Sequence, residues 1–280
     1  MTKIPPVAPG RSYLFVPGDR QDRFDKAWGS GADHVIIDLE DAVAPAQKNA
    51  ARRAAADWMT PERPVWLRIN AFNTPWNESD IELAAHPGVC GFMIPKAEHL
   101  PPAFIKACLE RKKRLIPLVE TALGFKNLPG LAEAATVERL AFGSIDFQVD
   151  MAIEGEDDAL AYFRSQLVLT SRLADIHPPI DGVTTDLNDP EVLRQDTLRA
   201  KRFGFGGKLC IHPRQVAPVN RIFLPNDGEL AWARAVIQAA NLSDGAIVTL
   251  YGKMIDKPVL AKAKRIVDAA IKAAEPSQQR

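Results

Sequence analysis

Two carboxylates follow two successive apolar runs of the sequence, and their type indicates a metal site. Glu120 ends the run LIPLVE (115–120), and Asp146 comes just after the run RLAFG (139–143). Neither acid has a His or Cys beside it, and two oxygen donors without soft ligands favour Mg²⁺ or Mn²⁺ over Zn²⁺. Alternatively, each carboxylate could pair with an Arg or Lys. Spacing alone leaves both possibilities open.

Arg68 lies inside the apolar run VWLRIN (65–70). An unpaired guanidinium would be costly to bury there. Its partner could be a structural carboxylate such as Glu40, or a carboxylate or enolate oxygen of a substrate, which the planar fork can bind with two hydrogen bonds.

The segment IIDLEDAVAP (36–45) carries three carboxylates within four residues. Like charges so close repel each other unless a cation or basic side chains neutralise them. We expect Asp38 to cap a loop amide. Glu40 and Asp41 are better placed to bind water around a metal ion or to hold Arg68.

Eight short apolar runs that are rich in β-branched residues must position these side chains. They are residues 12–17, 34–40, 65–70, 91–96, 115–120, 139–143, 178–185 and 207–213. Most lack polar alternation, which is typical of parallel strands covered on both faces, and helical segments separate them. The pattern predicts a (β/α)8 TIM barrel, in which the polar strand ends converge on one mouth. A doubly wound open sheet is the alternative, but no G-x-G-x-x-G follows the first run.

The chain is longer than a barrel alone requires. We expect a barrel core over 1–225, with a closing helix and a C-terminal lid or oligomerisation arm over 226–280. Residues 227–240 are the expected eighth helix of the barrel. A turn-rich stretch and a second helix over 257–274, with Pro258 allowed in its first turn, follow it.

Composition excludes several classes of function. Lys+Arg and Asp+Glu are equal at 35 each, so no net charge attracts nucleic acid or anionic lipid. The three cysteines neither form an even set nor lie in a close pair, which predicts reduced thiols. The N-terminal residues lack the apolar core of a signal peptide, and no apolar run is long enough for a membrane span. We expect a cytoplasmic protein without nucleic-acid or membrane partners.

Seven motifs in order carry a resemblance that covers nearly the whole chain. They are RSYLFVPGDR (11–20), DLEDAV (38–43), LRIN (67–70), PKAE (95–98), VETALG (119–124), FGSIDF (142–147) and KLCIHPRQV (208–216). Together they resemble the HpcH/HpaI aldolase and citrate lyase family. Within it the chain is similar to the citrate lyase β-subunit-like branch, which includes citryl-, malyl- and citramalyl-CoA lyases.

The resemblance implies a homotrimer or hexamer, with Mg²⁺ (or Mn²⁺) held by Glu120 and Asp146, and substrate oxygens held by Arg68. The related free-acid aldolases carry a His directly after the second-strand acid, in the pattern D-x-E-H. Here Asp41 stands in that place. The difference favours the CoA-thioester branch, in which the proton-transfer residue lies elsewhere.

These features predict a magnesium-dependent carbon–carbon lyase that cleaves or forms a 3-hydroxy-3-carboxyacyl-CoA. Its partners would be an acyl-CoA and a 2-oxo acid. Arg68 would stabilise the thioester enolate, and backbone amides from Gly143, Ser144 and their neighbours would hold the substrate carboxylate. Arg20, in the loop after the first strand, is the candidate for a CoA contact.

Asp256 lies in YGKMIDKP (251–258), which resembles the tail motif that carries the catalytic Asp of the CoA-dependent branch. We expect it to act as general acid–base over the barrel mouth of a neighbouring subunit. The alternative is that Asp256 only caps the helix that follows it.

Two rival functions remain open at this point. One is a free 2-oxo acid aldolase that works without CoA. The other is a carrier-dependent citrate lyase β subunit, which would ignore soluble acyl-CoA.

Overall fold

The computed structural model describes residues 9–155, 157–242 and 248–274. The chain divides into two compact units, Met1–Asn220 and Arg221–Arg280. Within the described ranges, no helix is both long enough and apolar enough to cross a membrane.

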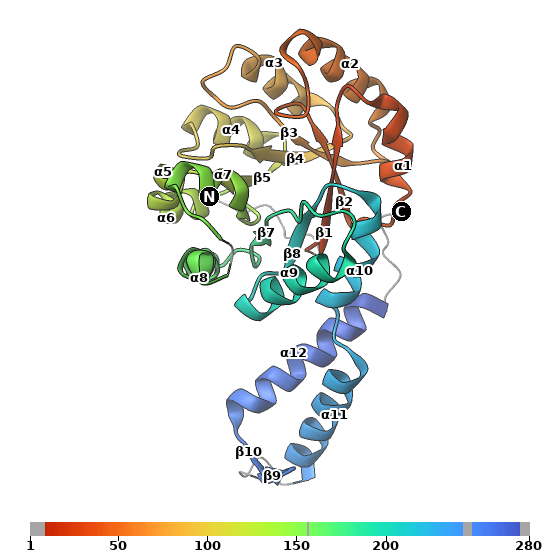
Figure 1. Ribbon diagram of the computed structural model, residues 1–280, viewed down its shortest axis with the longest axis vertical. Helices are drawn as coiled ribbons and strands as arrows, with labels where there is room; N and C mark the ends of the chain where they lie inside the picture. Colours follow the sequence, from red (N-terminus) through yellow and green to blue (C-terminus); the bar gives the residue numbers. More distant parts are fainter. Residues whose placement is uncertain (1–8, 156, 243–247, 275–280) are drawn as a thin grey trace. The chain divides into compact units, whose positions relative to one another are not determined.

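The first unit is a closed barrel of eight parallel strands, which confirms the predicted (β/α)8 fold (Figure 1). The strands pair in sequence order, and β1 closes the barrel by pairing with both β2 and β8. Their bounds are β1 Ser12–Pro17, β2 His34–Asp38, β3 Val65–Arg68, β4 Val89–Ile94, β5 Arg114–Val119, β6 Ala141–Phe142, β7 Ile180–Asp181 and β8 Gly207–Cys210.

The sequence predicted β1 with these bounds, whereas β7 is much shorter than the expected 178–185. Two prolines, Pro178 and Pro179, precede β7 and have no N–H to donate to a neighbouring strand. The ladder can therefore begin only at Ile180, which pairs with Ala141 and Gly207.

Every strand contributes an apolar side chain to the barrel interior. The buried cluster consists of Tyr13, Ile36, Trp66, Met93, Ile116, Leu118, Ala141, Ile180 and Leu209. Side chains alternate along a strand, so the residue two positions after an inward one also points inward. Polar residues that follow these apolar positions at the carboxyl ends of the strands therefore face the mouth.

Helices surround the strands. In α2, Lys48–Trp58, the buried residues Ala51, Ala55 and Trp58 recur at a spacing of three to four, as expected for one helix face against a sheet. The other helices of this unit are α1 Phe24–Trp28, α3 Asn77–Glu82, α4 Pro102–Glu110, α5 Ala122–Lys126, α6 Leu128–Ala132, α7 Ser144–Met151, α8 Asp157–Leu173 and α9 Pro190–Phe203, with 3-10 turns η1 Gln21–Arg23, η2 Pro45–Gln47 and η3 Leu83–Ala85. A further helix, α10 Pro213–Phe223, begins in this unit and ends just past its last residue, Asn220.

The assignment of residues 227–240 as the closing helix of the barrel was wrong. The helix that directly follows β8 is α10, which buries Gln215, Val216 and Val219. It contains Pro218, and a proline inside a segment argues against a helix because its ring removes a backbone hydrogen bond. The segment 227–240 forms most of a different helix, α11 (Asp227–Leu242), in the second unit.

In the second unit, α11 packs against α12 (Lys257–Ala274). Between them lies a hairpin of β9 (Val248–Leu250) and β10 (Lys253–Ile255). Its two turn residues, Tyr251 and Gly252, have φ angles of 51° and 73°, which suit a tight turn between antiparallel strands. The start of the expected turn-rich stretch, residues 243–247, lies outside the described residues.

Candidate active site

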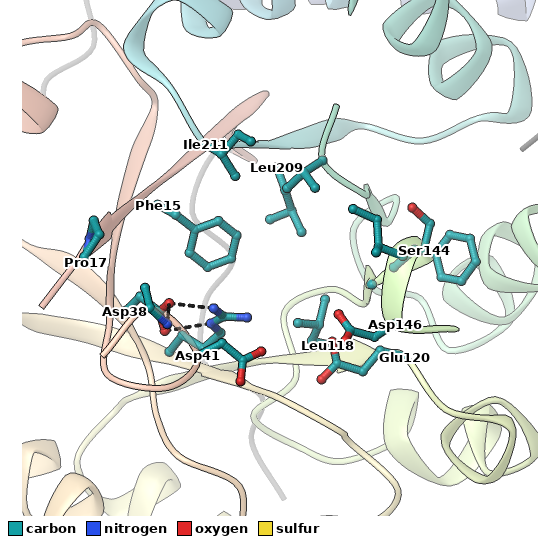
Figure 2. Close-up of a pocket in the computed structure, with 16 residues that line it drawn as sticks. Phe15, Pro17, Asp38, Asp41, Leu118, Glu120, Ser144, Asp146, Leu209 and Ile211 are labelled. Atoms are coloured by element: carbon teal, nitrogen blue, oxygen red, sulfur yellow. Dashed lines mark hydrogen bonds and ion pairs between the residues drawn. The ribbon is translucent and has the colours of Figure 1, made fainter. Parts of the chain in front are cut away.

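A cavity of about 370 Å³ opens at the carboxyl ends of the barrel strands (Figure 2). It brings together most of the residues that the sequence singled out. Its charged lining residues are Asp38, Asp41, Arg68, Glu120 and Asp146, and Gly143 and Ser144 lie beside them. The cavity is therefore acidic, with four carboxylates and one guanidinium.

Glu120 and Asp146 lie next to each other on one wall of the cavity (Figure 2). Glu120 follows β5 and points inward, two residues after the inward Leu118, and it is 3% exposed. Asp146 is exposed in the first turn of α7, where the helix dipole favours a negative charge. A Cβ atom added at Gly143 would lie 2.6 Å from both Cβ and Oε2 of Glu120, so only glycine fits there.

This pair of acids fits a hard divalent cation. Burial, together with the nearby charges of Glu40 and Asp146 and against the opposing effect of Lys96, raises the pKa of Glu120 to about 8. A bound cation would relieve the cost of this buried charge. The described part of the chain holds no group of three or more His, Cys, Asp or Glu side chains arranged for a metal. Two carboxylates, with water and substrate as further ligands, suit Mg²⁺.

Arg68 points inward at the end of β3, two residues after the inward Trp66. Its guanidinium binds Asp38 through two hydrogen bonds, of 2.8 Å from Nε and 2.5 Å from Nη2. The two residues are register partners on β2 and β3. Burial disfavours the charge of Arg68, but Asp38 and Glu40 outweigh it and raise the pKa of the guanidinium above its ordinary value.

Asp38 also caps the loop after β2, as predicted. Its carboxylate accepts hydrogen bonds from the backbone N–H groups of Glu40 (2.9 Å) and Ala42 (3.1 Å). The sequence left the partner of Arg68 open and suggested Glu40 as a structural candidate. The structure assigns the two-bond contact to Asp38, while Glu40 Oε2 lies 3.3 Å from Nη1 of Arg68.

Lys96 joins two of the acids, a role that the sequence did not reveal. Its Nζ donates to Glu40 Oε1 at 2.8 Å, and its backbone N–H donates to Glu120 Oε1 at 2.6 Å. The φ angle of Lys96 is 46°, a left-handed conformation that is unusual for a residue other than glycine. The sequence shows only that Lys96 is a charged residue at the end of a strand. It does not show the backbone conformation on which these two contacts depend.

Buried polar groups hold the loop that carries Glu40 and Asp41. Lys48 Nζ donates to the carbonyl oxygens of Leu39 (2.8 Å) and Glu40 (2.7 Å). Asn70 Nδ2 donates to the Leu39 oxygen as well, at 2.9 Å. These hydrogen bonds hold the backbone of the loop in place. Asp41 is exposed and points into the cavity towards Glu120 (Figure 2).

Gly143 and Ser144 line the cavity at the start of α7. The first N–H groups of a helix have no partner within it, so this end of α7 offers hydrogen-bond donors to an anion. Ser144 is 3% exposed.

Three predicted site residues are not among those that line the cavity. Glu40 lies behind the lining, where it is 6% exposed and bound to Lys96 and Arg68. Arg20 is exposed and forms a two-bond ion pair with Asp22, at 2.9 Å for each bond. Asp256 lies in the second unit, where its Oδ1 accepts a hydrogen bond from the N–H of Val259 at 3.1 Å. Capping of α12 by Asp256 is therefore confirmed, and its catalytic role stays a prediction.

Comparisons with known proteins show which family the chain resembles over most of its length. The family model for HpcH/HpaI aldolase/citrate lyase matches residues 11–213. The citrate lyase subunit beta-like protein of Deinococcus radiodurans is 36% identical, over 94% of this chain and 98% of the relative. Mitochondrial citramalyl-CoA lyase of Rattus norvegicus is 32% identical, over 94% of this chain and 86% of the relative.

A solved structure is similar over the same length. The crystal structure of CitE from Mycobacterium tuberculosis in complex with magnesium, acetoacetate and coenzyme A has a TM-score of 0.81 and 34% sequence identity, and the match covers 94% of this chain and 98% of that one. The chain therefore belongs to the HpcH/HpaI aldolase/citrate lyase family.

Proposed function

We propose that this chain is a magnesium-dependent carbon–carbon lyase that cleaves and forms a 3-hydroxy-3-carboxyacyl-CoA, with an acyl-CoA and a 2-oxo acid as the other partners. The observation that carries the proposal is the meeting of Glu120 and Asp146 in one cavity with Arg68. The magnesium and coenzyme A bound to the similar CitE structure support it.

Glu120 and Asp146 would hold Mg²⁺, which when bound supplies Lewis-acid polarisation of the 2-oxo acid oxygens. N–H groups in the first turn of α7, beginning at Ser144, would bind the 2-oxo acid carboxylate. The N–H of Gly143, which the sequence also suggested for this role, donates instead to the carbonyl oxygen of Val119 at 2.9 Å. Arg68 keeps N–H groups beyond the two that Asp38 accepts, and these would stabilise the negative charge on the thioester enolate oxygen.

In the cleavage direction, the proton of the C3 hydroxyl passes to Asp41, and the bond between C3 and the α-carbon of the thioester breaks. The electron pair of that bond moves onto the thioester as an enolate, while C3 becomes the carbonyl of the 2-oxo acid. The enolate then takes a proton at its α-carbon. We assign that proton to Asp256 of a neighbouring subunit, on the family resemblance of the tail motif.

The support for a CoA thioester over a free acid is Asp41, which stands where the free-acid aldolases carry a His. Glu40, beside it, is bound to Lys96 and Arg68, and this leaves Asp41 as the exposed acid of the loop.

The full chain should be tested with Mg²⁺, acetyl-CoA or propionyl-CoA, and a set of 2-oxo acids, with mass spectrometry of the CoA products. The proposal predicts a CoA adduct that contains the 2-oxo acid. A carrier-dependent subunit would leave soluble acyl-CoA unchanged. A free-acid aldolase would join a 2-oxo acid to an aldehyde without CoA, and either result would overturn the proposal.

A further inference from the structure

One wall of the cavity is apolar. Phe15, Leu118 and Leu209 point into the space near the two carboxylates (Figure 2), and Val183 and Ile211 also line it. Leu118 and Leu209 belong to the barrel core, and Phe15 packs against that core. The wall is thus a rigid continuation of the core, and a substrate group that contacts it loses its water.

Among the described residues that line the cavity, Arg68 is the one cation. Two of its N–H groups are bound to Asp38, and Nη1 lies 3.3 Å from Glu40. The donors that remain are those that the proposed reaction uses for the enolate oxygen. Arg68 therefore has little capacity to neutralise another anion.

Three lysines near the mouth have partners as well. The ammonium of Lys96 is 2.8 Å from Glu40 and 4.0 Å from Glu120. Lys48 donates to two backbone carbonyls below the loop. Lys208 on β8 is 2% exposed and donates to the carbonyl oxygen of Gly182. None of these three side chains lines the cavity that the structure describes.

We infer that the 2-oxo acid taken by this site has a short, uncharged substituent, as in pyruvate or 2-oxobutyrate, and that a second carboxylate, as in oxaloacetate, is strongly disfavoured. This inference rests on the proposed function and narrows its substrate class. It concerns the group attached to the 2-oxo carbon, which would contact the apolar wall.

The physical reason is the charge of the site. The α7 donors and the metal site would be occupied by the first carboxylate and the carbonyl oxygen of the 2-oxo acid, and Arg68 by the enolate. Mg²⁺ would neutralise Glu120 and Asp146, and Arg68 neutralises Asp38, so a second carboxylate would meet apolar side chains and the unpaired Asp41. Among the described lining residues, no cation would be left free to bind it. An unpaired carboxylate in such surroundings is costly, whereas a methyl or ethyl group gains from contact with the wall.

The test compares kcat/KM for condensation of acetyl-CoA by the full chain with pyruvate, 2-oxobutyrate, oxaloacetate and 4-methyl-2-oxopentanoate. The substituents of the last two acids have the same number and connectivity of non-hydrogen atoms, and they differ in charge. Product masses identify the acid that reacted, because oxaloacetate can lose CO2 and become pyruvate in the assay. We expect pyruvate to exceed oxaloacetate by about a hundredfold or more. We also expect the uncharged isostere to exceed oxaloacetate.

Equal or faster turnover of oxaloacetate would overturn the inference and leave the proposed function intact. Equal rejection of oxaloacetate and its uncharged isostere would also overturn it, since size and not charge would then decide. If none of the four acids forms a CoA adduct, the proposed function itself fails.

A pair of variants tests whether the apolar wall faces the substituent. Ile211 is 40% exposed and lines the cavity, so a longer polar side chain can reach the mouth without entering the core. Ile211→Arg adds a cation there, and Ile211→Gln adds polarity without charge. We expect Ile211→Arg to reduce the preference for pyruvate over oxaloacetate by about tenfold, relative to Ile211→Gln. The same preference in both variants would overturn the assignment of this wall.

Discussion

Asp38 and Arg68 are joined by two parallel hydrogen bonds between register partners of adjacent barrel strands, and both side chains lie at the mouth. This pair fixes the plane of the guanidinium before any substrate binds. The N–H groups that Asp38 does not accept are then held in place for an anionic oxygen.

Arg68→Lys tests this role. A single ammonium cannot make both bonds to Asp38 and still present donors to an enolate. We expect kcat to fall by about 10²–10³-fold. The free energy of unfolding should fall by only about 1–3 kcal/mol.

Arg52→Lys is a matched control, because Arg52 binds Asp80 at 2.9 Å with the same 14% side-chain exposure as Arg68 and does not line the cavity. Arg52→Lys should lower the free energy of unfolding by about as much as Arg68→Lys does, and should reduce kcat far less. Comparable losses of kcat in the two variants would show that Arg68 is mainly structural.

Gly143→Ala should weaken Mg²⁺ binding by about tenfold or more, because the new Cβ would lie 2.6 Å from Glu120 Oε2 and push that carboxylate aside. The φ angle of Gly143 is −84°, so the backbone itself accepts alanine. Gly130→Ala is the control, since a Cβ there would meet nothing within 4 Å. Titration calorimetry measures the Mg²⁺ affinity of both variants. Equal Mg²⁺ affinities of Gly143→Ala and Gly130→Ala would exclude Glu120 as a ligand.

His34 makes stability depend on pH. Its ring lies tilted against the ring of Tyr13, with the centroids 4.7 Å apart, and burial lowers the pKa of His34 to about 4. The unfolded chain takes up a proton below about pH 6.5, whereas the folded chain does not until about pH 4. His34 should therefore reduce stability as the pH falls from about 6.5 to 4, by at most about 1.4 kcal/mol per pH unit.

His34→Gln removes this titration and leaves the other groups in place. Urea unfolding of both proteins across that range should give a steeper loss of stability in the wild type as the pH falls. Parallel curves would mean that His34 titrates normally.

Asp256→Asn separates capping from proton transfer. Asn caps a helix about as well as Asp, so α12 should remain stable, but the amide cannot exchange a proton. The variant should bind Mg²⁺ and CoA normally and fail to exchange the α-protons of acetyl-CoA with deuterated water. Normal exchange would restrict Asp256 to its observed hydrogen bond with Val259.

Mixing this variant with Glu120→Ala tests whether the tail serves a neighbouring subunit. Hybrid oligomers would contain some intact barrels beside intact tails, so activity should return. If hybrids form and stay inactive, Asp256 does not act across subunits.

The barrel and the set of residues at its mouth were predictable from the sequence, but their pairing was not. Apolar runs reveal parallel strands, and polar residues at their ends, such as Glu120 and Arg68, must converge. Which acid meets Arg68 depends on the register between β2 and β3, which places Asp38 opposite it. Lys96 was visible as a charged residue at a strand end, but its contacts with Glu40 and Glu120 were not predictable, because they depend on a left-handed backbone that the sequence does not show. The helix α10 was missed because of Pro218.

The most direct test of the proposed function is cleavage of citramalyl-CoA in deuterated water, with and without EDTA, followed by mass spectrometry of the CoA products. The enolate should take a deuteron at its α-carbon. We therefore expect pyruvate and acetyl-CoA with one deuterium in the acetyl methyl group. The reaction should disappear with EDTA or in Glu120→Gln. Release of free CoA with intact citramalate would indicate thioester hydrolysis instead, and would contradict the assignment of this cavity to carbon–carbon cleavage.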